Sequence, residues 1–260
     1  MRTSFVNSAD GTRLRLAHWG ETGREVLLVH GLAEHAGRYE HVGAAFAAAG
    51  MRLTLVELRG HGHSGGKRGH VDRWSDYIAD VQAAASTLQP GWALLAHSMG
   101  GLVALDGLRE ALKPSRTGLS NALVGVRVKL PAWKAFAGKV LSRILPALPM
   151  KNEIDPAQLS RDLEVGKTYL ADPLVFDTAT PRWYTEMLAA LERVNNHPTY
   201  PLPLAFFVGD DDQITDPVRN QELAKKHNAQ LVVYPGFRHE LVNEIGREQV
   251  IADMVRFFSE

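Results

Sequence analysis

The stretch that decides the fold is Leu94-Leu95-Ala96-His97-Ser98-Met99-Gly100-Gly101, near the middle of the chain. Its apolar first half predicts a buried strand that runs directly through Ser98 into a helix. A serine on such a sharp turn stands above the edge of a sheet, where the N–H groups that open the helix favour a developing negative charge. Glycine is usual two residues before the serine, and Ala96 is its smallest substitute. The stretch therefore predicts a nucleophilic serine, although a plain small-residue turn between strand and helix is the alternative.

Strand and helix patterns alternate on both sides of this stretch. Asp10-Gly11 predicts an N-terminal hairpin between strand-like residues 3–6 and 12–19. Short apolar runs predict further strands at 26–29, 53–56, 92–95, 204–208 and 231–234. Helical patterns fall at 39–49, 74–88, 99–112, 217–227 and 247–258. The alternation favours an α/β protein with an open, mostly parallel, doubly wound sheet.

One long stretch interrupts the alternation. Residues 124–199 contain helix-like segments broken by prolines and no evident sheet strand. A plain connection in a compact domain is much shorter. We therefore expect a core made of residues 1–123 and 200–260, with a helical cap inserted at 124–199.

Composition excludes several functional classes. The 260 residues include 29 Lys+Arg and 29 Asp+Glu, so the formal net charge is zero and no nucleic-acid partner is expected. The chain has no cysteine, which excludes disulfides, thiolate metal sites and cysteine nucleophiles. The first residues lack the apolar segment of a secretory signal, and no apolar run is long enough to span a membrane. A cytoplasmic location is the resulting expectation.

A nucleophilic serine needs a base and an acid that orients the base. His239 lies in a Pro-Gly loop after the last predicted strand, which makes it the best base candidate among eleven histidines. The strand at 204–208 runs into Asp210-Asp211-Asp212, and one of these carboxylates is expected to be the acid. The residue pattern alone does not choose among the three.

An acyl-transfer site also needs donors for an oxyanion. His30-Gly31-Leu32 follows a predicted buried strand, so the backbone N–H groups of Leu32 and Met99 are the expected donors. His61 and His63 form a His-x-His pair, but their glycine-rich loop has no acidic or thiol ligand close in sequence. No metal and no other cofactor is therefore expected.

Taken together and in order, these motifs resemble the monoacylglycerol lipase and lysophospholipase branch of the α/β-hydrolase superfamily. The resemblance covers nearly the whole chain and is carried by residues 30–39, 59–66, the Ser98 turn, 209–217 and 234–239, with a cap-like pattern at 152–174. It implies an α/β-hydrolase fold and selects Asp212 as the acid beside Ser98 and His239. It also implies that the polar end of the pocket is lined by Glu34, Arg38, His97 and Tyr169. Ala96 and Glu57 depart from the usual pattern.

The resemblance implies a serine esterase or lipase that cleaves single-chain lipid esters, such as monoacylglycerols, through an acyl-enzyme and without a cofactor. A lysophospholipase or a broad carboxylesterase is the nearest alternative, since a basic cap suits a phosphate. A proline-type aminopeptidase is a weaker one, because it would want acidic cap residues. A non-catalytic binding protein of the same fold is weaker still, because such proteins usually lose a triad residue. The oligomeric state stays open.

The predicted cap carries an amphipathic pattern. From Ala122 to Asn152 there are six basic residues and no acidic ones. Between Lys134, Lys139 and Arg143, apolar residues recur at helical spacing: Trp133, Phe136, Ala137, Val140, Leu141, Ile144, Leu145 and Leu148. Three interpretations fit such a helix: it lies on an anionic interface, it lines an acyl-chain tunnel, or it packs on the core. The pattern thus suggests a transient, peripheral membrane contact through the cap, with the other two interpretations open.

Overall fold

The computed structural model describes residues 1–127 and 132–260, without the side chains of residues 132–137. Within these residues the chain forms an eight-stranded sheet in the order β1-β2-β4-β3-β5-β6-β9-β10. β1 and β2 are antiparallel to their neighbours, and the other strands pair in parallel. The strands are β1 (Arg2–Asn7), β2 (Arg13–Trp19), β3 (Glu25–Val29), β4 (Arg52–Val56), β5 (Ala93–His97), β6 (Thr117–Ser120), β9 (Leu204–Gly209) and β10 (Gln230–Tyr234).

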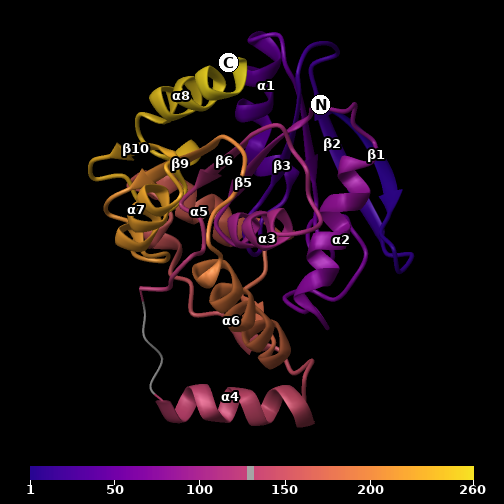
Figure 1. The fold of residues 1–260 in the computed structure, drawn as a ribbon. Coiled ribbons are helices and arrows are strands. Elements are labelled where there is room, and N and C mark those ends of the chain that lie inside the picture. The colour runs from indigo at the N-terminus through magenta and orange to yellow at the C-terminus, as the bar shows by residue number, and fades with distance from the viewer. Residues whose placement is uncertain (128–131) are drawn as a thin grey trace.

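Helices cover both faces of the sheet, as continuous apolar strands require. α1 (Glu40–Ala48) and α8 (Arg247–Ser259) pack on the face that includes Val26 and Leu28 of β3. α2 (Trp74–Ala85), α3 (Met99–Leu108) and α7 (Pro217–Lys226) pack on the face that includes Leu27 and Val29. Both layers are visible in Figure 1. The predicted hairpin and mostly parallel α/β sheet are confirmed.

Two local features differ from the sequence expectation. The sequence analysis did not predict β6, because Thr117-Gly118-Leu119-Ser120 has only one large apolar residue. The structure nevertheless buries this strand between β5 and β9. α3 ends at Leu108 rather than near residue 112, because Ala111 and Leu112 both donate to the Gly107 carbonyl and close a turn. β6 matters most, since its carboxyl end lies beside the Ser98 turn.

The segment predicted as a cap contains α4 (Ala132–Ile144), α5 (Leu163–Ala171) and α6 (Pro181–Asn196). The segment also contains a short antiparallel strand pair, β7 (Met150–Lys151) with β8 (Thr178–Ala179). Among its described residues, no strand joins the central sheet. α6 buries Trp183 and Met187 against the core, whereas α4 packs against α6 at the outer end of the molecule (Figure 1). Three short 3-10 turns complete the described elements: Ala36–Tyr39, Pro156–Gln158 and Leu241–Asn243.

Two further findings concern the predicted membrane features. Within residues 1–127 and 132–260, no helix combines the length and the apolar character needed to cross a bilayer. Several side chains of the predicted amphipathic pattern lie outside the described residues: Trp133, Phe136 and Ala137 of the apolar stripe, and the basic Lys134.

Candidate active site

Ser98 sits on a strained turn between β5 and α3. Its backbone φ of 51° lies in the left-handed region that few non-glycine residues adopt. A Cβ at Gly100 would lie 2.4 Å from the Val29 carbonyl oxygen, so glycine is required where the helix passes β3. Ala96 is fully buried and paired with Val29 and Leu119 in the sheet. The turn is thus formed with alanine at the position where glycine is usual.

The structure brings Ser98, His239 and Asp212 into one hydrogen-bonded row. His239 Nε2 lies 2.9 Å from Ser98 Oγ, and His239 Nδ1 lies 2.8 Å from Asp212 Oδ2. The three residues come from the turn after β5, the loop after β10 and the loop after β9, which meet at the carboxyl edge of the sheet. This is the arrangement in which a base and an acid activate a serine.

The geometry distinguishes Asp212 from its two neighbours. Asp212 is fully buried, and its carboxylate also accepts from the backbone N–H groups of Ile214 and Thr215, at 2.8 and 3.1 Å. Asp210 instead accepts from the Gly236 N–H, and the Asp211 side chain is 48% exposed and bonded to Gln213. Asp212 is therefore the carboxylate that contacts His239.

The charges of this row support each other. Burial alone raises the pKa of Asp212, but the adjacent His239 and the hydrogen bonds to the carboxylate lower it below its ordinary value. Burial likewise lowers the pKa of His239, and the Asp212 carboxylate raises it above its ordinary value. Asp212 is thus ionised and stabilises the charged form of the imidazole.

The predicted oxyanion donors lie next to the serine. Leu32 and Ser98 line the same pocket, and Met99 is the first residue of α3. A Cβ on Gly31 would lie only 3.1 Å from Ser98 Cβ, so the loop that contains Gly31 and Leu32 passes close to the serine side chain. The loop then turns at Ala33, whose φ is 62°. Both backbone N–H groups therefore come from segments that border the Ser98 side chain.

A buried ionic cluster forms the polar end of the pocket. The Glu34 carboxylate accepts from the Gly31 N–H at 2.7 Å, the Tyr39 hydroxyl at 2.8 Å and Arg38 Nε at 3.4 Å. The Arg38 guanidinium also donates to both Glu240 oxygens, the longer of these bonds being 2.7 Å. Burial raises the pKa of Glu34, but the charge that His97 carries in acid and the Arg38 cation hold it at about 2. Glu240 was not predicted; it directly follows His239, and that adjacency was its only sequence signal.

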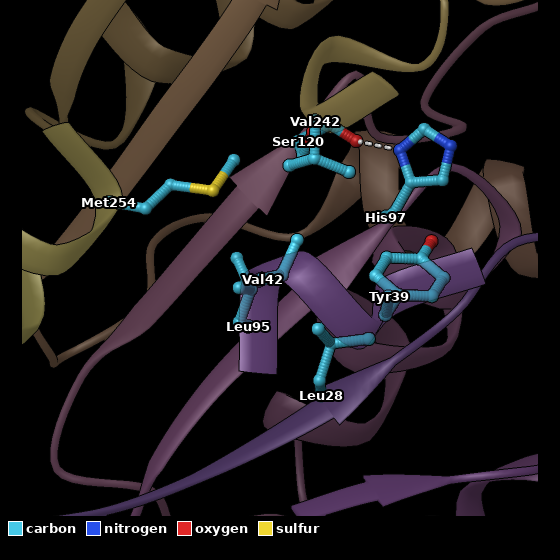
Figure 2. A pocket seen from close by; sticks show the side chains of 8 residues that line it. All are labelled: Leu28, Tyr39, Val42, Leu95, His97, Ser120, Val242 and Met254. Atoms are coloured by element: carbon cyan, nitrogen blue, oxygen red, sulfur yellow. Dashed lines mark hydrogen bonds between the residues drawn. The ribbon is translucent and has the colours of Figure 1, made fainter. Parts of the chain in front are cut away.

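His97 and Tyr169 complete the predicted pocket residues. The His97 ring lies 4.8 Å from the His239 ring, and its Nδ1 is 3.0 Å from the Ser120 carbonyl oxygen (Figure 2). Burial lowers the pKa of His97 to about 4, so its ring is neutral at pH 7. Tyr169 lies on α5, and the Arg38 guanidinium stacks 5.0 Å from its ring centre. Three of the four predicted lining residues, Glu34, His97 and Tyr169, line the pocket at Ser98. Arg38 does not line it, because its guanidinium is paired with Glu34 and Glu240.

The pocket at Ser98 has a volume of about 30 Å³. Its lining combines the polar residues above with three apolar side chains from the predicted cap and the Asp212 loop: Ile154, Leu159 and Ile214. One water needs roughly 10–15 Å³ of such space, so the pocket has room for about two or three waters. This conformation therefore admits a small group at Ser98 but not an acyl chain.

His61 and His63 take different positions. His61 is fully buried, its ring packs 4.9 Å from His30 and 5.1 Å from Phe176, and burial lowers its pKa to about 3. His63 is exposed, and its backbone N–H donates to the Glu57 carboxylate. Among the described residues, no group of three or more His, Cys, Asp or Glu side chains is arranged to hold a metal ion.

The parallel sheet, the strained serine turn and the order Ser98, Asp212, His239 define the class of an α/β-hydrolase. Comparison with known proteins gives the particular family. The chain belongs to the family described as serine aminopeptidase S33, whose profile matches residues 20–246, and its similarity to monoacylglycerol lipases confirms the predicted resemblance.

Three relatives show how far the similarity extends. The chain is 35% identical to a monoacylglycerol lipase of Mycolicibacterium smegmatis, over 88% of this chain and 85% of that protein. It superposes on the crystal structure of Paleococcus ferrophilus monoacylglycerol lipase with a TM-score of 0.87 and 28% identity, covering 94% of this chain and 98% of the other. It is also 30% identical, over 90% of its length, to an abhydrolase domain-containing protein of Dictyostelium discoideum, of which it spans only 26%.

Proposed function

We propose that this protein is a carboxylic ester hydrolase that cleaves single-chain lipid esters of neutral alcohols, above all monoacylglycerols. The names of its Mycolicibacterium smegmatis and Paleococcus ferrophilus relatives support this substrate class. The observation that carries the chemistry is the row of hydrogen bonds from Ser98 through His239 to Asp212.

In the proposed mechanism, Ser98 Oγ attacks the ester carbonyl carbon while His239 Nε2 takes the hydroxyl proton. The backbone N–H groups of Leu32 and Met99 stabilise the oxyanion of the tetrahedral intermediate. Asp212 holds the imidazole by Nδ1 and stabilises its charged form. His239 then gives the proton to the departing glycerol oxygen, which leaves the acyl group on Ser98. Water attacks the acyl-enzyme in the same way, with His239 again the base, and releases the fatty acid.

The charges at the polar end of the pocket support a neutral head group. The Arg38 cation is already paired with two carboxylates, those of Glu34 and Glu240. A phosphate would need an unpaired cation there and would meet Glu34, which is held ionised. The hydroxyl groups of a glycerol are donors and suit carboxylate acceptors. The pocket therefore favours monoacylglycerol over a lysophospholipid.

We also propose that residues 124–199 form a cap over a core of residues 1–123 and 200–260, and that α4 makes a transient, peripheral contact with a lipid surface. Ile144 is 69% exposed, and Val140, Leu145 and Leu148 are exposed beside it. Lys139 and Arg143 are exposed on the same helix, at the outer end of the molecule (Figure 1). Exposed apolar side chains with cations between them suit an anionic interface. The small pocket further implies that the cap moves before a long acyl chain enters.

The substrate class is tested by a hydrolysis panel of 1-oleoylglycerol, oleoyl-lysophosphatidylcholine, oleoyl-lysophosphatidylglycerol and a p-nitrophenyl butyrate standard. We expect kcat/KM for 1-oleoylglycerol to exceed that for either lysophospholipid by about 10-fold or more, since one unfavourable charge contact costs at least ~1.4 kcal/mol in a desolvated site. Equal or faster lysophospholipid hydrolysis would make the protein a lysophospholipase, and hydrolysis of the aryl ester alone would make it a broad carboxylesterase.

The membrane contact is tested by Ile144→Asp, with Val218→Asp as the matched control. Val218 is 61% exposed but lies on α7 of the core. We expect Ile144→Asp to reduce adsorption to phosphatidylglycerol vesicles and hydrolysis of 1-oleoylglycerol in them, while p-nitrophenyl butyrate hydrolysis is unchanged. Added salt should weaken wild-type adsorption, because exposed charges are screened beyond about 8–10 Å. Equal adsorption of both variants and the wild type would remove α4 from the proposal.

A further inference from the structure

A short segment after β6 contacts all three loops of the candidate triad. The Ser98 N–H donates to the Ser120 carbonyl at 3.1 Å, and the Leu123 N–H donates to the Ser98 carbonyl at 2.9 Å. Between these residues, the Asn121 N–H donates to the Phe207 carbonyl at 3.0 Å, which extends the pairing of β6 with β9. The backbone of this segment therefore already fixes the serine turn against the end of β9.

The Asn121 side chain connects the other two loops to this segment. Its Nδ2 donates to the carbonyl oxygens of Arg238 at 3.0 Å and His239 at 2.9 Å. Its Oδ1 accepts from the Gly209 N–H at 2.9 Å. Both amide hydrogens and one carbonyl lone pair are thus used on backbone groups. One of those groups belongs to His239 itself, and another lies three residues before Asp212.

The surroundings of Asn121 leave these bonds little freedom. The residue is fully buried, and its φ of 40° lies in the left-handed region, which asparagine tolerates better than most residues. A Cβ on Gly209 would lie only 2.4 Å from the Phe237 carbonyl oxygen, so the two loops are in direct backbone contact beside the amide. The Thr215 hydroxyl donates to Asp212 Oδ2 at 2.6 Å, and the same Oγ1 lies 3.4 Å from the Asn121 carbonyl oxygen.

We propose that Asn121 is a positioning residue of the catalytic row: by binding the backbones of the histidine loop and the acid loop at once, it sets the separation of His239 and Asp212 and directs the imidazole toward Ser98. The inference takes the triad from the proposed function and adds a fourth residue that does not touch the substrate. A misplacement of about 1 Å in such a row costs up to about 100-fold in rate, whereas the fold loses only a few hydrogen bonds.

The test compares Asn121→Gly with a matched control, Asn220→Ala. Glycine keeps the left-handed backbone and removes the amide. Asn220 is also fully buried, and its amide donates to the Ala122 and Asp216 carbonyls at 2.9 and 3.0 Å, without a bond to the histidine loop. With p-nitrophenyl butyrate and the folded fraction checked by circular dichroism, we expect Asn121→Gly to lower kcat by about 10- to 100-fold at nearly constant KM. Asn220→Ala should lose similar stability but keep kcat within about threefold.

Each outcome decides the proposal. A folded Asn121→Gly with wild-type kcat overturns it, and so does an equal loss of kcat in both variants, which would be a general effect of destabilisation. Asn121→Ser, which keeps one short donor, should fall between glycine and wild type and replaces Asn121→Gly if that variant does not fold. If neither variant folds while Asn220→Ala does, Asn121 is only structural and the proposal fails. A wild type that hydrolyses no ester would instead overturn the proposed function, and this inference with it.

Discussion

Replacing Asp212 by asparagine exchanges one carboxylate oxygen for an NH₂ group and leaves the size of the side chain nearly unchanged. Asp212 Oδ1 accepts two backbone N–H groups, from Ile214 and Thr215, so in Asp212→Asn this position keeps the carbonyl oxygen. The new amide group then takes the place of Oδ2, 2.8 Å from His239 Nδ1. Two donors cannot share that hydrogen bond, so His239 must present the lone pair of Nδ1 and carry its proton on Nε2. An imidazole in this tautomer cannot accept the proton of Ser98.

The expected loss is large because the base itself is lost. A histidine base held in the wrong tautomer costs about 10⁴-fold in kcat, or about 5 kcal/mol of transition-state stabilisation. The assay is the initial rate with p-nitrophenyl butyrate at saturating substrate. We expect Asp210→Asn and Asp211→Asn to stay within about threefold of wild type, because neither carboxylate contacts His239. If Asp211→Asn were the crippling change, or if folded Asp212→Asn kept more than about a tenth of the activity, the assignment of the acid would be wrong.

Three further predictions concern the pKa of His239, the ion pairs of Arg38 and the space around two glycines. The acid limb of kcat/KM should have its midpoint above pH 6.5, because the Asp212 carboxylate raises the pKa of His239 against the effect of burial and only the neutral ring is a base; a midpoint below 6.5 would contradict this. Arg38→Met should lower the free energy of unfolding by about 3–5 kcal/mol in urea titrations, since it leaves Glu34 and Glu240 buried without their cation, and adding Glu240→Gln should recover part of the loss. Gly100→Ala should destabilise the protein by about 1–3 kcal/mol because its Cβ meets the Val29 carbonyl at 2.4 Å, whereas Gly138→Ala, whose nearest contact is 3.7 Å away on Tyr184, should stabilise it by up to about 1 kcal/mol. Thermal melts that rank these two glycine variants the other way would contradict the last prediction.

The sequence predicted the parts of the site that depend on local pattern. The Ser98 turn is a continuous stretch of strand, small residues and helix, so its conformation is visible in the order of the residues. His239 and the aspartate run were found because each follows an apolar strand, and parallel strands bring their carboxyl ends to one edge. Which aspartate faces His239 depends on the path of a single loop, so the residue pattern alone left three candidates.

The residues missed by the sequence analysis depend on contacts between distant segments. Glu240 is paired with Arg38, 202 positions away, and Asn121 donates to a carbonyl 118 positions away. Neither pairing leaves a periodic pattern in the chain. β6 was missed for a related reason: its four residues are held by β5 and β9 on either side, and their own composition only weakly favours a strand. Such features become predictable only when the neighbours of a segment are known.

The central claim, that Ser98 is the nucleophile of an ester hydrolase, is tested most directly by the release of oleic acid from 1-oleoylglycerol by wild type and Ser98→Ala. The hydroxyl is removed while the turn and its glycines stay, so the variant should keep the thermal midpoint of wild type. The account predicts turnover by wild type and a loss of about 10³-fold or more in folded Ser98→Ala. Substantial oleate release by the folded variant would contradict the account, whatever the activity of the other substitutions.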